Sequence, residues 1–429
     1  MERDEPSENG LSSLAGELLV GDGLDEGLKG GTLALGAEAA RADTADEAGQ
    51  GAVGGGEVGE GAFVHGGGER IGVIAGRGQG QIDAVSVPRP SAPEILPTHT
   101  PALFDAAVRR AAAALRAGEV VALPTETVYG LAANALDALA VGKIYEAKGR
   151  PAHNPIIVHV AGLELARGCA SAWPAVAERL AAAFWPGPLT LVVPRAAGIP
   201  DMVTAGGATV GVRWPSHPFM QAVIRACGFP LAAPSANPSN QVSPTNAEHV
   251  RRLLGARVPL IIDGGQAQVG IESTVLDLTV DPPRVLRPGM IHEESLRAVL
   301  GEVRGEKGEG RAAEGSALRS PGQLAKHYSP QARLVVFAWR DEGELLSRLA
   351  QLGLPGADCH VIAHSHVPRA EGFAGVSVIP HDAEAFARAL YAEWHRCDEA
   401  GARVIVMEAL PEGPEWRGLN DRLRRAASR

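Results

Sequence analysis

The 429-residue chain has a composition that fits globular packing, with 45% apolar residues and a formal net charge of -10. Because no stretch of 18 or more apolar residues occurs and the first residues, MERDEPSENG, are acidic, we expect a cytoplasmic protein with no membrane span. The charge is concentrated at one end. Residues 1–100 hold 17 acidic and 6 basic side chains, whereas the remainder is nearly balanced at 33 and 34. This balance argues against a protein that holds nucleic acid mainly through its phosphates.

The four cysteines are far apart and include no CxxC pair, so they predict buried thiols rather than a zinc site or a disulfide framework. Residues 1–98 are rich in Gly, Ala, Glu and Asp and show no sustained hydrophobic period. This composition predicts a low-complexity, disordered extension; an acidic regulatory tail is the alternative.

Hydrophobic patterning begins near Pro101, where residues 104–117 predict an amphipathic helix and residues 120–123 a short strand. Strands and helices then alternate, which predicts an α/β domain over residues 99–300 built round a twisted sheet. The other strands expected there are 156–160, 189–193, 209–214, 260–263 and 273–278, and the other helices are 135–147 and 218–227.

Residues 301–332 are polar and glycine-rich in their first part and predict an interdomain linker. Over residues 333–429 the alternation of strands and helices predicts a smaller, Rossmann-like domain with a parallel sheet and no nucleotide-binding glycine loop. Its expected strands are 333–339, 359–364, 376–380 and 403–410, and its expected helices are 342–352, 383–397 and 419–427.

The densest cluster of polar residues is LPTETVYGL at Leu123–Leu131, followed by KIYEAKGRPAHNPIIVHV at Lys143–Val160. A strand that runs into Pro124 presents the next three side chains, Thr, Glu and Thr, at its carboxyl end, where open α/β sheets place ligands. An ordinary strand-to-helix cap is the alternative, because Thr is a good N-cap residue.

Lys148 is unusual because the chain has only five lysines and otherwise uses arginine as its cation. Its ammonium lies two residues from the Arg150 guanidinium, and Gly149 between them lets the backbone approach a ligand closely. That arrangement suits a polyphosphate, although a solvated helix end with two cations is an alternative. His159 follows on a predicted strand, where a histidine is more often structural than catalytic.

Arg213 lies in an otherwise apolar strand and therefore needs an anionic partner, which could be an internal carboxylate or a substrate carboxylate. LAAPSANPSNQVSPT at Leu231–Thr245 combines small side chains with several prolines. It predicts a rigid loop whose amides and serine hydroxyls face an anion; a purely structural loop is the alternative. ESTVLDL at Glu272–Leu278 and RPG at Arg287–Gly289 add hydroxyls and another cation.

Several common signatures are absent, namely the GxxxxGK[ST] phosphate loop, HExxH, GxSxG and the kinase motifs. His360, His364 and His366 form a histidine-rich patch beside Cys359. Their alternation with apolar residues fits a strand and its exit loop, with metal binding as the alternative.

Taken together, PTETVYGL, KIYEAKGRP, FWPGPLT, VRWP, PSANPS, ESTV and RPG, in this order, resemble the YrdC-like threonylcarbamoyl-AMP synthases. SPGQLAKHYSP at Ser320–Pro330, followed by a small α/β domain, resembles the long, two-domain form of that family. The likeness covers residues 101–429 and implies a YrdC-like twisted mixed sheet with helices plus a smaller Rossmann-like C-terminal domain. The linker departs from the family pattern, because relatives commonly carry Met after SPG, and this departure concerns the geometry of a lid rather than the chemistry.

The resemblance implies an L-threonylcarbamoyladenylate synthase, a nucleotidyltransferase that makes threonylcarbamoyl-AMP and pyrophosphate from L-threonine, bicarbonate and ATP. Its product would serve N6-threonylcarbamoyladenosine modification of tRNA position 37 through downstream threonylcarbamoyl-transferase proteins. In that reaction the carboxylate of N-carboxy-threonine attacks the α-phosphate, which calls for cations and oriented amides rather than a protein nucleophile. Mg²⁺ is expected on the phosphates of ATP.

The same resemblance implies roles for individual residues. The expected catalytic residues are Lys148, Arg150, Ser235 and Asn237. The expected ATP contacts are Lys148, Arg150, Asn154, Thr209, Ser235, Asn237, Ser243 and Arg287, with Tyr328 of the linker as a lid. The expected threonine contacts are Thr127, His159, Arg213, Ser273 and the backbone of Ala233. No protein side chain is assigned to a metal.

Two rival functions stay open. An RNA-binding module without catalysis could use Lys148, Arg150 and Arg213 on a concave surface, and its affinity would fall steeply with salt. Carbamoyl-adenylate formation for another acceptor is the second rival. Proteins of that kind usually carry additional zinc-finger and acylphosphatase-like domains, whose cysteine spacing this chain lacks.

Overall fold

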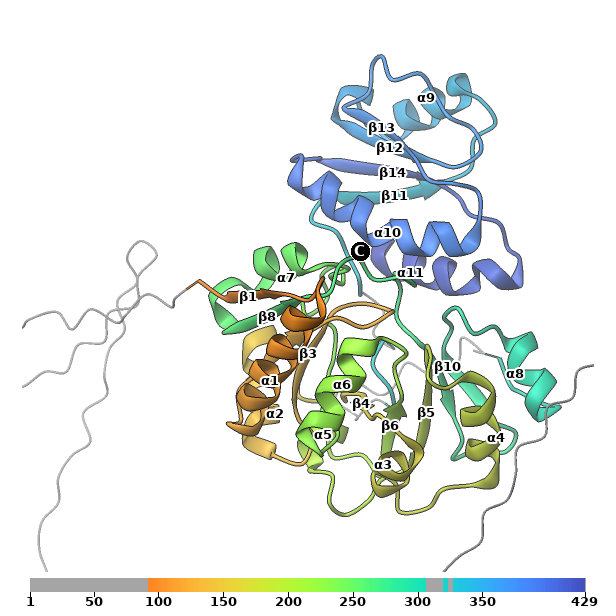
Figure 1. The fold of residues 1–429 in the computed structure, drawn as a ribbon. Helices are drawn as coiled ribbons and strands as arrows, with labels where there is room; N and C mark the ends of the chain where they lie inside the picture. The colour runs from red at the N-terminus through yellow and green to blue at the C-terminus, as the bar shows by residue number, and fades with distance from the viewer. Residues whose placement is uncertain (1–91, 306–318, 323–326, 429) are drawn as a thin grey trace, which may run out of the picture. The chain divides into compact units, whose positions relative to one another are not determined.

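The computed structural model describes residues 92–305, 319–322 and 327–428, all within one compact unit of the chain, Val85–Arg429. Most of the predicted low-complexity extension, residues 1–91, lies outside the described residues. Two sheets, one of ten strands and one of four, organise the described residues (Figure 1). Among these residues, no helix combines the length and apolar character that a membrane span requires.

The larger sheet mixes parallel and antiparallel strand pairs, which confirms the expected twisted mixed sheet. Its strands are β1 (Glu94–Pro97), β2 (Val121–Leu123), β3 (Gly130–Asn134), β4 (Val158–His159), β5 (Leu189–Pro194), β6 (Thr209–Arg213), β7 (Leu231–Ala232), β8 (Leu260–Asp263), β9 (Thr274–Asp277) and β10 (Arg284–Arg287). They lie in the order β1-β8-β2-β3-β7-β4-β6-β5-β9-β10.

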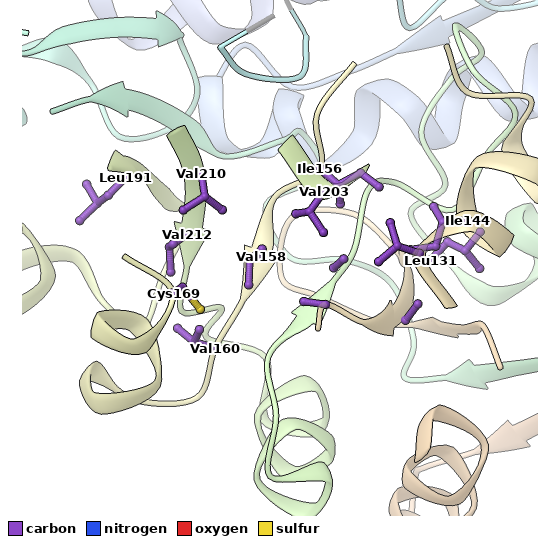
Figure 2. Packing of buried hydrophobic residues seen from close by; sticks show 14 of the residues in the cluster. Leu131, Ile144, Ile156, Val158, Val160, Cys169, Leu191, Val203, Val210 and Val212 are labelled. Atoms are coloured by element: carbon purple, nitrogen blue, oxygen red, sulfur yellow. The ribbon is translucent and has the colours of Figure 1, made fainter. Parts of the chain in front are cut away.

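Helices pack against this sheet through two separate apolar clusters. One cluster joins α1 and α6 to β2 and β8, and the other joins α2 and α4 to the central strands. Figure 2 shows part of the second, in which Val212 lies between its strand partners Val158 and Leu191 and near Cys169. The helices are α1 (Pro101–Arg116), α2 (Ala138–Lys148), α3 (Leu163–Gly168), α4 (Ala175–Phe184), α5 (Asp201–Thr204), α6 (Pro218–Cys227), α7 (Ala247–Leu254), η1 (Gly255–Arg257) and α8 (Glu293–Leu300).

The sheet starts earlier in the chain than the sequence predicted. Strand β1 pairs in parallel with β8 and lies before residue 98, where the extension was expected to end. Helix α1 likewise begins at Pro101 rather than residue 104, because the Thr100 hydroxyl caps it by accepting a hydrogen bond from the Leu103 amide at 3.3 Å.

The segment after β2 is a loop between two antiparallel strands, not a strand-to-helix connection. Residues 124–129 lead into β3, which pairs antiparallel with β2. The helix-cap interpretation of this segment was therefore wrong. The Thr125 hydroxyl instead donates to the Val128 carbonyl at 2.6 Å, and the cap of the next helix, α2, is Asp137.

The smaller sheet is entirely parallel, as predicted for the C-terminal domain. Its order is β11-β14-β12-β13. Its elements are β11 (Arg333–Phe337), α9 (Glu342–Gln351), η2 (Gly356–Asp358), β12 (Cys359–Ala363), β13 (Gly375–Val378), α10 (Ala383–Glu399), β14 (Val404–Glu408), η3 (Pro414–Trp416) and α11 (Arg417–Ala427).

One buried apolar cluster joins this smaller domain to the loops of the larger one. Tyr391 and Trp394 of α10 belong to the same cluster as Val128 and Ile271 of the larger domain and Tyr328 of the linker. All four cysteines are buried and unpaired, which confirms the prediction of buried thiols.

Candidate active site

A single pocket collects most of the side chains singled out in the sequence. It is lined by polar residues from the β2–β3 loop, the end of α2, β4, β6, the loop after β7, the segment before β9, the end of β10 and the linker. The predicted residues that line it are Thr127, Arg150, His159, Arg213, Ala233, Ser235, Ser273, Arg287 and Tyr328. It is also lined by Thr125, Val128, Gly130, Ile157, Pro234, Glu272, Pro321 and His327.

Local backbone structure explains how several of these residues meet. His159 and Arg213 are register partners in the parallel pair β4 and β6, so their side chains share one face of the sheet. Helix α2 ends at Lys148, and Gly149 takes the left-handed conformation, φ 59°, that ends a helix and redirects the chain. Arg150 follows this turn directly and reaches the pocket.

Arg213 has an internal carboxylate partner, which resolves one of the alternatives left by the sequence. Its Nη2 lies 2.7 Å from Glu126 Oε1, and both side chains are more than 90% buried. Its Nη1 donates to the Thr127 hydroxyl at 2.9 Å, and its Nε donates to the Gly187 carbonyl at 3.2 Å. Burial raises the pKa of Glu126, but the Arg213 charge outweighs that effect and brings the pKa below its ordinary value.

His159 is a neutral group at physiological pH. Burial, reinforced by the Arg213 charge, lowers its pKa to about 3, and no described residue is a hydrogen-bond partner of its Nδ1. On the same wall the hydroxyls of Ser273 and Thr190 lie 2.8 Å apart. A buried ring nitrogen without a partner costs free energy unless a ligand bonds to it.

Arg150 and Arg287 are held by neutral oxygens. Arg150 donates to the Asn154 carbonyl at 3.0 Å, to Asn154 Oδ1 at 2.9 Å and to the Pro155 carbonyl at 2.5 Å. Arg287 donates to the Ser273 carbonyl at 3.0 Å and to its hydroxyl at 3.1 Å. Burial lowers the pKa of both guanidinium groups, to about 10 for Arg150.

Lys148 lies behind the pocket wall instead of facing the cavity. Its Nζ donates to the carbonyls of Ser235 and Asn237, each at 2.5 Å, and so fixes the loop after β7. Asn237 fixes the same loop from within, because its Nδ2 donates to the Gln241 carbonyl at 2.8 Å. Burial, followed by the Arg150 charge, places the pKa of Lys148 well below its ordinary value.

Three other predicted residues do not line the main pocket. Asn154 is buried and orients Arg150, and the Ser243 hydroxyl donates a hydrogen bond to Glu272 Oε1 at 2.6 Å. Thr209 lines a neighbouring pocket that shares Ile157 and Pro321 with the main one. The predicted residues therefore fall into three groups. Some line the main pocket, others support those residues from behind, and Thr209 lines the neighbouring pocket.

The linker closes one side of the pocket with Tyr328, which is fully buried and has a positive φ of 61°. Among the residues that the structure describes, none lies in hydrogen-bonding geometry to its hydroxyl. A Cβ added at Gly322, φ 85°, would lie 2.7 Å from both Tyr328 Oη and Arg287 Cδ, so only glycine fits there. Burial lowers the pKa of His327 to about 3, and its Nδ1 also has no hydrogen-bond partner within the described ranges.

Two carboxylates at the site were not among the residues given a role there, although Glu126 was noted as one of three polar side chains at the end of a strand. Glu126 stands behind Arg213, and Glu272 lines the pocket and pairs with Arg422 of α11, whose Nε lies 2.8 Å from Oε2. Both belong to motifs noted in the sequence, PTET and ESTV. An acidic residue next to a buried strand is the signal that could have identified them.

The histidine-rich patch of the smaller domain is partly a strand, as expected, because His360 lies in β12. Within the described ranges, one group of three side chains could hold a metal ion, namely His360, Glu393 and Cys397. Arg396 lies among them, since its Nη2 is 2.7 Å from His360 Nε2 and 2.6 Å from Glu393 Oε1. That cation neutralises Glu393 and competes with any metal.

Fold and pocket together define an α/β protein of two sheets with one enclosed, cation-lined site. Comparisons with known proteins narrow this class to one family. Residues 113–289 match the Sua5–YciO–YrdC family model, described as telomere recombination, and residues 291–428 match the threonylcarbamoyl-AMP synthase C-terminal domain.

Two relatives and one solved structure illustrate the likeness. The chain is 40% identical over 324 residues to a threonylcarbamoyl-AMP synthase of Pyrococcus abyssi, covering 75% of this chain and 94% of the relative. It is 48% identical over 233 residues to one of Bacillus subtilis, covering 54% and 67%. The crystal structure of P. abyssi Sua5 complexed with L-threonine is 37% identical, with a TM-score of 0.69, and covers 78% of this chain and 97% of that one. The chain belongs to the threonylcarbamoyl-AMP synthase family, in its two-domain form.

Proposed function

We propose that this protein is an L-threonylcarbamoyladenylate synthase, which converts L-threonine, bicarbonate and ATP into threonylcarbamoyl-AMP, pyrophosphate and water. The product is a mixed anhydride that carries the threonylcarbamoyl group, and we expect threonylcarbamoyl-transferase proteins in the cytoplasm to pass that group to adenosine 37 of tRNA. Family membership and the L-threonine bound to the P. abyssi structure support this proposal.

The distribution of charge around the pocket is the observation that carries the proposal. Lys148, Arg150 and Arg287 are buried, and within the described residues they bond to neutral oxygens without a carboxylate partner. Arg150 and Arg287 line the pocket, and desolvated guanidinium groups to which no described carboxylate bonds directly are costly unless a ligand supplies negative charge. A polyphosphate brings the missing negative charge, so ATP is the ligand that this end of the pocket suits.

The other end of the pocket is neutral overall, because Arg213 is already paired with Glu126. A zwitterion such as threonine has no net charge, so it can enter this end without upsetting the balance. Its carboxylate would bond to Arg213, and its hydroxyl would find hydrogen-bonding groups in Thr127, His159 and Ser273. The unpartnered Nδ1 of His159 supports this assignment.

The chemistry follows from placing these two ligands side by side. Bicarbonate and the threonine amine give N-carboxy-threonine and release water. A carboxylate oxygen then forms a bond to the α-phosphorus, and the bond to the bridging oxygen of pyrophosphate breaks. Arg150 and Arg287 would stabilise the negative charge that builds up on the phosphates, and Lys148 would hold the Ser235–Asn237 loop in the shape that meets them.

The pocket does not suit a metal ion held by the protein. Glu272, the carboxylate that lines it, is engaged by Arg422 and Ser243, and Glu126 is paired with Arg213. Mg²⁺ that arrives on the ATP phosphates needs few protein ligands, and we propose that it enters as part of the MgATP substrate.

Burial of the cations disfavours the RNA-binding alternative. Lys148 and Arg213 are 3% and 4% exposed, and Arg150 is bonded inside the pocket. A phosphate backbone needs cations on an accessible surface. These groups can reach a small ligand that enters the cavity, but not a duplex or a folded RNA.

The test is to incubate the protein with MgATP, bicarbonate and each amino acid in turn, and to identify adenylates by mass spectrometry. We expect threonylcarbamoyl-AMP with threonine only, with pyrophosphate released in equal amount. Arg213→Ala serves as the inactive control. Adenylates that form without bicarbonate, or equally with every amino acid, would contradict the proposal.

A further inference from the structure

The last helix of the chain sends a fully buried arginine towards the pocket. Arg422 of α11 has no exposed surface, and its Nε and Nη2 donate to Glu272 Oε2 at 2.8 Å and to the Glu272 carbonyl at 3.1 Å. Its Nη1 donates to the Pro288 carbonyl at 2.8 Å. Arg422 therefore bonds to Glu272 and Pro288, the chain neighbours of the pocket residues Ser273 and Arg287.

The same guanidinium packs on the linker tyrosine. Its central carbon lies 5.1 Å from the centre of the Tyr328 ring, which is a cation–π distance. The Tyr391 ring stacks on the Tyr328 ring, with 6.1 Å between the two ring centres. The backbone of α11 holds the residues on either side, because His327 N donates to the Arg425 carbonyl and Ser329 Oγ to the Ala426 carbonyl, each at 3.3 Å. The Tyr328 hydroxyl is thereby fixed at the pocket.

Electrostatics explain why this contact matters for a ligand. Glu272 is a buried carboxylate that accepts hydrogen bonds from the hydroxyls of Ser243 and Tyr391. The cations that act on its charge are Arg422, the pocket residue Arg287 and Lys148. Arg422 also pairs with Asp421 at 3.0 Å, a carboxylate that Arg424 and Arg425 neutralise as well. Without Arg422, Glu272 would draw Arg287 into an ion pair, because a buried carboxylate needs a partner. Arg287 would then offer less positive charge to a phosphate. With Arg422 present, the hydrogen bonds that Arg287 donates among the described residues go to the neutral oxygens of Ser273.

We propose that Arg422 is a positioning residue of the nucleotide site: it neutralises Glu272, so that Arg287 stays available to the phosphates of ATP, and it fixes the Tyr328 ring at the pocket. The C-terminal domain is in this way part of the binding site. The inference rests on the proposed function for the identity of the ligand, MgATP.

The experiment measures the dissociation constant of MgATP by calorimetry, without turnover, for the wild type and three variants of the full chain. For Arg422→Gln we expect the dissociation constant to rise more than tenfold. For Arg422→Lys, which keeps the charge but loses the several fixed donors of the guanidinium, we expect a rise of a few-fold. For Arg422→Gln combined with Glu272→Gln we expect most of the lost affinity to return, because the competing carboxylate is gone while the contact with the Tyr328 ring is still missing. A merely structural role would make this double variant at least as weak as the single one.

Two further readouts keep the result decisive. In Arg422→Gln, affinity should improve as pH falls from 8 to 6, because protonation of Glu272 releases Arg287; the wild type should show no such gain. Arg417→Gln, on the same helix and paired with Glu293 at the surface, should bind MgATP like the wild type. If Arg422→Gln does not fold, Arg422→Lys and the double variant decide the question.

Unchanged affinity in Arg422→Gln or Arg422→Lys, or a double variant as weak as the single one, would overturn the inference. A wild type that binds MgATP but makes no threonylcarbamoyl-AMP would contradict the proposed function alone.

Discussion

The two ends of the pocket use buried arginines in opposite ways. At one end Arg213 has its own carboxylate, Glu126, at 2.7 Å, so the pair is complete before any ligand arrives. At the other end, the hydrogen bonds that Arg150 and Arg287 donate within the described part of the chain go to neutral oxygens, so no carboxylate there bonds to either of them directly. The paired arginine therefore contributes to the fold as well as to the site, whereas the unpaired arginines are held for the ligand. Substitutions at the two ends should separate stability from binding.

The largest effect is expected from Arg213→Ala. This change leaves Glu126 buried without a partner and should lower the free energy of unfolding by about 3 to 5 kcal/mol. It should also abolish threonine-dependent pyrophosphate release. Chemical denaturation and a pyrophosphate assay measure the two effects separately.

A double variant, Arg213→Ala with Glu126→Ala, isolates the cause. Removing both charges should recover much of the lost stability but none of the activity, because the stranded carboxylate is gone while the threonine contact is still missing. If the double variant were as unstable as the single one, packing rather than charge would account for the loss.

Arg150→Ala should show the reverse pattern. We expect the dissociation constant of MgATP to rise about 100-fold, equivalent to about 2.7 kcal/mol, since a charge-assisted contact to phosphate is lost. Stability should fall by only about 1 kcal/mol, because no carboxylate is left unpaired. Lys143→Ala is the matched control, a half-exposed cation on α2 paired with Glu119 at the surface, and should change neither quantity appreciably.

His159, which lies at the Arg213 end of the pocket, should make the free energy of unfolding depend on pH. Because burial and Arg213 lower the pKa of His159 from 6.5 to about 3, the unfolded chain binds a proton between these values that the folded chain does not. The stabilising contribution is therefore complete above pH 6.5 and is lost as pH falls towards 3. At pH 5 the free energy of unfolding should be lower by about 2 kcal/mol from this group alone.

Denaturation curves at pH 7 and pH 5 test this expectation, with His159→Gln as the comparison. The variant cannot be protonated in this range, so its stability should fall less between the two pH values than that of the wild type. An equal loss of stability between pH 7 and pH 5 in the wild type and the variant would mean that His159 is not held neutral in the folded protein.

The sequence predicted helices and strands well where residues that start or end such an element stood at both of its ends. Helix α6 was predicted with its observed bounds, because Pro218 starts it and Gly228 ends it in the left-handed conformation. Strand β8 was also predicted to the residue. Strands β1 and β3 were missed because EILP and GLAAN carry little alternation, and β1 is paired with β8, more than 160 residues away.

The site shows a similar limit. Motif order identified the residues that surround the pocket, but it could not tell a lining side chain from a supporting one. Lys148 bonds to carbonyls almost 90 residues further along the chain, and that choice depends on tertiary packing. Arg422 gave no signal at all, since the arginine-rich sequence of α11 looks like a solvated helix face although one of its arginines is fully buried.

The smallest effect is expected at the linker, where Gly322 touches the unpaired end of the pocket. Gly322→Ala must place a Cβ 2.7 Å from both Arg287 Cδ and Tyr328 Oη, at a φ of 85° that costs about 1 to 2 kcal/mol in a residue other than glycine. Arg287 or the tyrosine must move, so MgATP affinity should fall about tenfold.

Gly353→Ala separates backbone strain from contact at the site. Gly353 also has a positive φ, 65°, but no atom lies within 4 Å of its added Cβ, and it follows helix α9 in the smaller domain. Both variants should lose a similar small amount of stability to backbone strain, with a further loss from the clash in Gly322→Ala, and only Gly322→Ala should weaken MgATP binding. Because the linker glycine acts on Arg287, an unpaired cation, its effect belongs to binding, whereas threonine-dependent contacts at the Arg213 end should be unchanged. Equal MgATP affinity in the two variants would show that the linker does not shape the nucleotide end of the pocket.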